Sequence, residues 1–159
     1  MWGTLDDPER DARKALLHLI AGGEVPGTDL LAVSLGCTRA EAVQLLDALV
    51  AKGYVVRDGD QGIIAAAYPL SVKPTRHRVT LGSGQAAYAL CAVDALGVSP
   101  LFGVSAAIEA RCPHCEQVIR LEVQNGEVLR RDPSGAVLWY SMADLLEKRI
   151  EGLNLAAEH

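Results

Sequence analysis

Two glycine-terminated helical segments joined by a very short turn are the feature that most limits how this chain can fold. Residues 28–36, TDLLAVSLG, and residues 37–53, CTRAEAVQLLDALVAKG, each end in glycine, the residue that favours the left-handed conformation just after a helix. Thr38 lies three residues before Glu41, which is the spacing of a capping box at a helix start. The sequence therefore predicts a helix-turn-helix.

An amphipathic helix precedes this unit and a hairpin follows it. In residues 7–23, DPERDARKALLHLIAGG, apolar side chains recur at three- and four-residue spacing and two glycines close the run. Residues 54–70, YVVRDGDQGIIAAAYPL, contain two β-prone runs around DGDQG. Residues 1–70 are therefore expected to form a winged helix-turn-helix domain.

The charge of the chain argues against nucleic acid as its partner. The formal net charge is −5 over 159 residues, so no general attraction to phosphate backbones is expected. Within residues 28–60 the acidic side chains outnumber the basic ones, which are Arg39, Lys52 and Arg57. A winged helix with this charge is expected to be structural or to contact protein rather than DNA.

The sequence also predicts a cytoplasmic protein without a membrane partner. No apolar run approaches the roughly 20 residues that span a bilayer, and the N-terminal MWGTLDDPERDARK is too charged for a signal peptide. In the cytoplasm cysteines are kept reduced. The four cysteines, Cys37, Cys91, Cys112 and Cys115, are therefore expected to be thiols or metal ligands rather than disulfides.

Residues 71–159 are predicted to form a second, mixed domain. The Asn125-Gly126 pair lies between two β-prone runs, which is a strong hairpin signal. Three or four antiparallel strands are expected there, followed by a terminal helix over residues 142–155, with Trp139 and Tyr140 in the core. The predicted fold class is therefore α+β, with the N-terminal winged helix-turn-helix packed on a small antiparallel-sheet and helix domain.

A thiol and a carboxylate stand three residues apart in a small, apolar run. Residues 85–96, QAAYALCAVDAL, are good helix formers, so a helix is predicted on which Cys91 and Asp94 project side by side. An apolar setting raises the pKa of a carboxyl group and keeps a thiol protonated until a soft cation displaces its proton. The alternative is that Cys91 is a small core residue and Asp94 a helix cap or surface acid.

Residues 69–112, from PLSVKPTRHRV to AIEARC, resemble the central region of the organomercurial (alkylmercury) lyases. That family carries a W-C-A-L-D-like motif just after a PTPHRF-like strand, and the motif stands here as Leu90-Cys91-Ala92-Val93-Asp94. The resemblance extends over most of the chain. It implies a fold of alkylmercury-lyase type for residues 71–159, mercury as substrate or product ion, and no organic cofactor.

The resemblance also implies roles for the two motif residues. In that family a cysteine thiolate captures the mercury of an organomercury cation, a second cysteine joins it, and an aspartate passes a thiol proton to the departing carbon. Cys91 would be the capturing thiol and Asp94 the proton carrier, both in contact with the metal. Pairing of thiolate with mercury is a soft–soft interaction, and a protonated carboxyl group is a suitable general acid.

One catalytic group of the family has no counterpart in this sequence. The family's second catalytic cysteine lies well downstream, whereas here the corresponding stretch is PSGAVLWYSMADLL, with no cysteine after Cys115. Whether the chain is still an enzyme is therefore open at the level of sequence.

Residues 112–115, CPHC, place two thiols at metal-ligand spacing between strand-like runs. Three interpretations stay open: a zinc site, a reactive thiol pair that helps to bind a thiophilic metal, and a plain hairpin turn. A closed zinc site needs four ligands, so His114, His77, Cys91 or another subunit would have to complete it.

The leading functional hypothesis is binding of organomercury or another thiophilic metal through Cys91 and Asp94, with protonolytic cleavage of the carbon–mercury bond open. A second hypothesis is a non-enzymatic, metal-responsive winged-helix regulator that uses Cys112 and Cys115. A third is a structural relative without either activity. A homodimer is compatible with the sequence.

Overall fold

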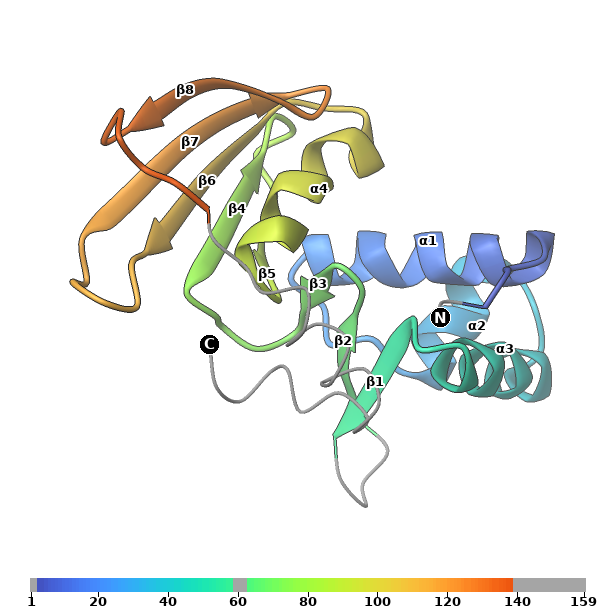
Figure 1. Cartoon of the computed structure of the whole chain (residues 1–159). Coiled ribbons are helices and arrows are strands. Elements are labelled where there is room, and N and C mark those ends of the chain that lie inside the picture. Colours follow the sequence, from blue (N-terminus) through green and yellow to red (C-terminus); the bar gives the residue numbers. More distant parts are fainter. Residues whose placement is uncertain (1–2, 59–62, 139–159) are drawn as a thin grey trace.

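The computed structural model describes residues 3–58 and 63–138, and it shows an α+β fold (Figure 1). The helices are α1 (Asp7–Ala21), α2 (Thr28–Leu35), α3 (Arg39–Ala51) and α4 (Ala92–Phe102). The strands are β1 (Val55–Asp58), β2 (Ile63–Ala67), β3 (Leu70–Ser71), β4 (His77–Leu81), β5 (Ala86–Ala89), β6 (Ala106–Arg111), β7 (Val118–Gln124) and β8 (Glu127–Asp132).

The first three helices begin and end where local sequence chemistry predicts. Thr38 and Glu41 form the expected capping box at the start of α3, because each side chain accepts a hydrogen bond from the other's backbone N–H. Gly36 ends α2 in the left-handed conformation, with φ of 65°, which a residue without a Cβ adopts at little cost. The predicted helices within residues 7–53 are confirmed.

A two-stranded hairpin, β1–β2, follows these helices, so the predicted order of helices and hairpin is present. The winged-helix assignment itself stays a prediction. Two basic side chains of this part, Arg39 and Arg57, form ion pairs with Asp29 and Asp47. Their charge is thus already balanced by neighbouring carboxylates.

All of the described strands belong to one antiparallel sheet, in the order β1-β2-β3-β5-β4-β6-β7-β8. Asn125 and Gly126 form the predicted hairpin turn between β7 and β8, with φ of 52° and 84°. The predicted terminal helix over residues 142–155, with Trp139 and Tyr140, lies outside the described residues.

The prediction of a helix over residues 85–96 is wrong in its first half. Residues Ala86–Ala89 form β5, which pairs with both β3 and β4, and the helix begins only at Ala92. Alanine has a high helix propensity, but pairing on both sides of a strand overrides a propensity of a few tenths of a kcal/mol per residue. Cys91 is the last residue before the helix, with an extended backbone.

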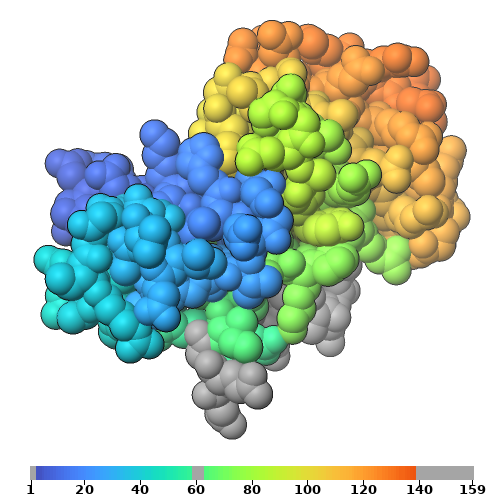
Figure 2. Space-filling model, turned by 180° about the vertical axis from the view of Figure 1, so that it is seen from behind, coloured from blue at the N-terminus to red at the C-terminus, as the bar shows by residue number. Residues whose placement is uncertain are grey.

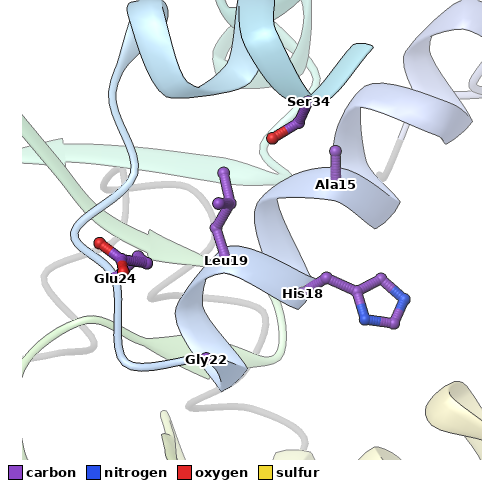
Figure 3. A pocket seen from close by; sticks show the side chains of 6 residues that line it. All are labelled: Ala15, His18, Leu19, Gly22, Glu24 and Ser34. Atoms are coloured by element: carbon purple, nitrogen blue, oxygen red, sulfur yellow. The ribbon is translucent and has the colours of Figure 1, made fainter.

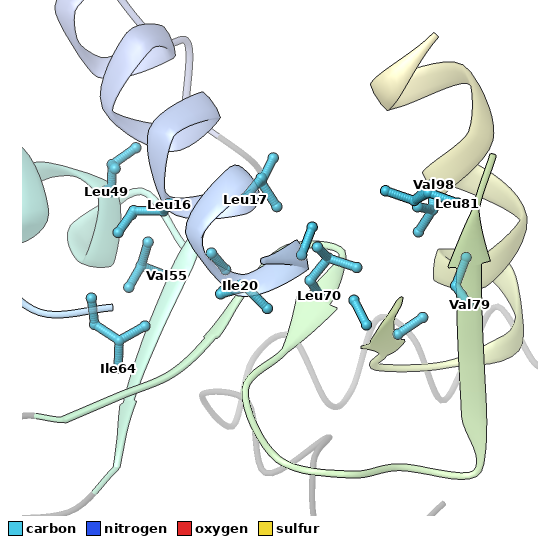
Figure 4. Packing of buried hydrophobic residues seen from close by; sticks show 14 of the residues in the cluster. Leu16, Leu17, Ile20, Leu49, Val55, Ile64, Leu70, Val79, Leu81 and Val98 are labelled. Atoms are coloured by element: carbon cyan, nitrogen blue, oxygen red, sulfur yellow. The ribbon is translucent and has the colours of Figure 1, made fainter. Parts of the chain in front are cut away.

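One continuous hydrophobic core joins the two halves of the chain, with α1 in the middle (Figure 4). Leu16 and Ile20 of α1 belong to the same buried cluster as Leu49 of α3 and as Val79 and Val98, which lie beyond residue 70. Seen from behind, the N-terminal helices and the C-terminal strands lie at opposite ends (Figure 2). The division at residue 70 stays a prediction, and the sheet runs across it without a break.

Within residues 3–58 and 63–138, no helix is long and apolar enough to cross a membrane.

Candidate functional site

Cys91 and Asp94 lie together at the N-terminus of α4, although not in the way that the sequence predicts. Cys91 is the N-cap of the helix, and the backbone N–H of Asp94 donates a hydrogen bond to its sulfur, with N and Sγ 3.4 Å apart. The sulfur thus takes the place of the hydroxyl or carboxyl oxygen that usually caps a helix. Asp94 is the third residue of the helix, and its carboxyl group therefore lies beside the thiol.

Burial raises the pKa of both groups. It is the largest cause for Cys91, whose pKa rises to about 11, and the neighbouring Asp94 carboxylate adds to the shift. Burial also raises the pKa of Asp94, although hydrogen bonds from Cys91 act in the opposite direction. The pair therefore holds protons more firmly than either group does in water.

Asp94 also lines an open depression of about 240 Å³ between α4 and the N-terminal half of the chain. Its walls come from distant segments: Arg13 of α1, Tyr54, Tyr68 and Pro69 around the first hairpin, and Gly97 and Leu101 of α4. Sequence reasoning missed these residues. They are up to about 88 positions apart in the chain, so no local pattern could have joined them.

Cys112 lies at the same end of the sheet as Cys91. Strands β5 and β6 flank β4, and both Ala89 and Ala110 pair with His77 at its start. Cys91 comes two residues after Ala89, and Cys112 comes two residues after Ala110. Because neighbouring strands are about 4.8 Å apart, β5 and β6 are separated by about 10 Å.

The CPHC segment forms the turn between β6 and β7. The backbone N–H of Cys112 donates to the carbonyl oxygen of Gln117, and the N–H of Glu116 donates to the carbonyl oxygen of Cys112. Hydrogen bonds from the backbone of Cys115 and His114 lower the pKa of the Cys112 thiol. Cys112 is partly exposed and Cys115 is exposed, so solvent reaches both residues of the turn.

The zinc interpretation of this turn is not supported. Among the described residues no group of three or more His, Cys, Asp or Glu side chains could hold a metal ion. A closed zinc site needs four such ligands, whereas the turn supplies two thiols. His77, the histidine that the sequence offered as a further ligand, has its Nδ1 atom buried without a hydrogen-bond partner among the described residues.

A larger depression of about 420 Å³ lies at the C-terminal end of α1 (Figure 3). His18, Glu24 and Ser34 line it, but their polar groups do not converge, since the His18 ring makes an edge-to-face contact with Phe102, with ring centroids 5.2 Å apart. The thiol–carboxyl pair of Cys91 and Asp94 is therefore the better candidate site.

Fold and site together define an α+β protein with a thiol–carboxyl pair at a helix N-terminus, beside the end of an antiparallel sheet. The chain belongs to the alkylmercury lyase (MerB) family, whose model matches residues 70–150. It is 32% identical over 125 residues to the alkylmercury lyases of Bacillus cereus and Clostridium butyricum. The matched region is 79% of this chain and 55% of each relative, so the chain spans about half the length of the curated relatives it matches.

A solved structure has the same fold. It is described as the mercury-bound form of MerB2, and it superposes with a TM-score of 0.66 at 24% sequence identity. The superposition covers 82% of this chain and 63% of that one. This likeness extends across residue 70 into the N-terminal part.

Proposed function

We propose that this chain binds an organomercury cation at Cys91 and cleaves its carbon–mercury bond with a proton carried by Asp94. The observation that carries the proposal is the contact at the start of α4, where the backbone N–H of Asp94 donates to the Cys91 sulfur, with N and Sγ 3.4 Å apart. Membership of the alkylmercury lyase family supplies the reaction class.

The first step is capture of the metal. Cys91 is protonated in the resting protein, because its pKa is raised to about 11. Mercury forms a bond to the sulfur and displaces the thiol proton, since soft metal and soft thiolate bind each other strongly. The Asp94 carboxylate accepts that proton, and its own raised pKa favours the protonated form.

The second step is cleavage. The electron pair of the carbon–mercury bond takes the proton from the Asp94 carboxyl group, so that a hydrocarbon leaves and Asp94 returns to its ionised form. The mercury, which is Hg(II) throughout, stays on the Cys91 sulfur and has lost its carbon ligand. A second thiolate must join it to balance its charge and complete its coordination.

We propose that the turn holding Cys112 and Cys115 supplies this second thiolate, in place of the family's downstream cysteine. The register supports this role, because Cys91 and Cys112 lie just beyond the ends of β5 and β6, the two strands that flank β4, at the same end of the sheet. The partial exposure of Cys112 also allows its sulfur to reach a ligand.

The test is release of benzene from a phenylmercury salt in reduced buffer. We expect Cys91→Ser and Asp94→Asn each to lower the rate by at least about a hundredfold, because each removes a group that contacts the reacting atoms. Cys112→Ser should lower the rate when external thiol is limiting, and excess small thiol should restore it.

Two control variants match these substitutions. Cys37→Ser removes a partly buried thiol at the turn between α2 and α3, and Asp47→Asn removes an exposed carboxylate of α3. Both should leave the rate within about twofold of the unchanged protein. Normal release by Cys91→Ser or by Asp94→Asn would overturn the proposed mechanism.

A further inference from the structure

We infer that the depression beside Asp94 binds the organic group of the substrate and that Arg13 selects groups carrying an anionic substituent such as a carboxylate. The inference rests on the proposed function, because it assigns the substrate class of the same site. It stands on the contacts of Arg13, on the lining of the depression and on the place of Asp94 at its edge.

Arg13 reaches the depression from the middle of α1 and is held there by two contacts. Its Nη2 atom donates a hydrogen bond of 2.8 Å to the carbonyl oxygen of Tyr68. Its guanidinium carbon lies 5.3 Å from the centroid of the Tyr54 ring, which is cation–π distance. The side chain is therefore fixed in place before any ligand arrives.

The charge of Arg13 is not balanced by a carboxylate within the described residues. None of the ion pairs among residues 3–58 and 63–138 includes Arg13, whereas Arg10 on the same helix pairs with Asp7, and Lys52 pairs with the buried Glu9. The Nε atom of Arg13 is buried without a hydrogen-bond partner in the described part of the chain.

An arginine in this state is a prepared anion site. Burial lowers the pKa of Arg13, but an arginine keeps its charge at neutral pH. A partly desolvated cation without a carboxylate partner is costly by itself, and a carboxylate bound in the depression beside the guanidinium recovers part of that cost. Water alone also solvates the group, but it brings no charge.

The rest of the lining suits a small aromatic or aliphatic group. Tyr54, Tyr68, Pro69 and Leu101 line the depression together with Asp94, so much of its wall consists of aromatic or apolar side chains. About 240 Å³ is below the roughly 300 Å³ at which pockets for drug-sized ligands begin, so one ring with one substituent is the fitting size.

The position of Asp94 determines which part of the substrate enters the depression. The carbon that receives the proton must lie within hydrogen-bond reach of the Asp94 carboxyl group. Cys91 holds the metal on the other side of that carbon and does not line the depression. The remainder of the organic group therefore extends from Asp94 toward Arg13.

The experiment separates the binding of the organic group from the chemistry. Benzoate and its neutral analogue benzamide are titrated onto the full chain by NMR, because neither compound contains mercury. We expect benzoate to bind about tenfold to hundredfold more tightly than benzamide, which is the usual effect of a charge-assisted hydrogen bond. In turnover, the specificity constant should likewise be higher for a phenylmercury salt that carries a ring carboxylate than for phenylmercury itself.

Three variants identify the residue responsible. Arg13→Gln should abolish the preference for benzoate, and Arg13→Lys should keep part of it because the positive charge remains. Lys14→Gln is the matched control, since it removes one positive charge from the next, exposed position of α1. It should leave the preference unchanged.

Equal affinity for benzoate and benzamide in the unchanged protein overturns the inference. So does a loss of the benzoate preference that is as large in Lys14→Gln as in Arg13→Gln. Neither result concerns the lyase reaction. Benzene release without a carboxylate preference would reject the inference and leave the proposed function standing. A clear preference for benzoate without benzene release would support the anion site at Arg13 and reject the proposed lyase reaction.

Discussion

Strands β5 and β6, which flank β4, are each followed by a cysteine, and the environments of the two cysteines differ. Cys91 follows β5, caps α4 and is partly buried beside a carboxyl group, and its pKa is raised to about 11. Cys112 follows β6 in a solvent-facing turn, where backbone N–H groups lower its pKa. Sulfur is the same atom in both, so the local backbone and the burial decide how firmly each holds its proton.

The difference shows how two cysteines of one protein can be suited to different steps of thiol chemistry. A protonated thiol beside an acid binds only an electrophile strong enough to displace the proton, and it passes that proton to a neighbour that can use it. A partly exposed thiol with a lowered pKa is suited to accept an ion from elsewhere. Four predictions test this contrast, beginning with the largest expected effect.

At a pH of about 8, iodoacetamide should modify Cys112 at least about a hundredfold faster than Cys91. Only the thiolate reacts, and a rise of two pKa units from 9.0 to about 11 lowers the thiolate fraction of Cys91 by about a hundredfold. Timed alkylation followed by peptide mass spectrometry measures both rates in one sample. Equal rates would break the comparison.

Asp94→Asn should accelerate alkylation of Cys91 at a pH of about 9 by roughly threefold to tenfold. The carboxylate charge raises the pKa of the thiol, so removing the charge lowers that pKa and increases the thiolate fraction. Asp47→Asn, at an exposed carboxylate on α3, is the control and should change nothing. A slower Cys91 in Asp94→Asn would show that the carboxyl group acts as a base instead.

The buried thiol should also make stability depend on alkaline pH. The folded state keeps the Cys91 proton up to a pH of about 11, whereas the unfolded chain releases it near 9.0, so ionisation favours unfolding between these values. We expect the free energy of unfolding to fall by about 1 kcal/mol more in the unchanged protein than in Cys91→Ala over this range. This figure includes a reduction for solvent screening of a partly exposed group.

Urea unfolding at pH values of about 8 and 10.5 measures the difference, and comparison with the variant cancels the titration of tyrosines and lysines. Parallel pH dependence in the two proteins would contradict the raised pKa of Cys91.

Substitution in the exposed turn should have the smallest effect. Cys112→Ser and Cys115→Ser should each change the free energy of unfolding by less than about 0.5 kcal/mol. The backbone–backbone hydrogen bonds of the turn remain in both variants, and a serine hydroxyl at position 112 can accept the N–H groups that now reach the Cys112 sulfur. A chelator should leave the thermal unfolding curve unchanged. A large loss of stability in either case would restore a structural metal at this turn.

Sequence reasoning succeeded where local spacing decides the structure. The Thr38–Glu41 cap, the Gly36 helix end and the Asn125-Gly126 turn are all short-range features. The nearness of Cys91 and Asp94 was also predicted, for the wrong reason, because a separation of three residues brings side chains together both on a helix face and from an N-cap to the third helical position.

It failed where distant segments decide. The identity of β5 depends on pairing with β3 and β4. The depression beside Asp94 depends on Arg13 and Tyr68, which carry no shared local signal. Cys91 and Cys112 share an end of the sheet only because His77 pairs with a residue of each neighbouring strand.

The position of α1 in the shared core has a consequence for how this chain can vary. One face of that helix supports the N-terminal hairpin, another contacts the sheet next to α4, and its middle carries Arg13. A deletion of residues 1–26 would therefore remove core side chains that support β3 and α4, as well as the wall of the depression that Arg13 forms. The folding of the segment that carries Cys91 thus depends on a helix that ends 70 positions earlier in the chain, at Ala21.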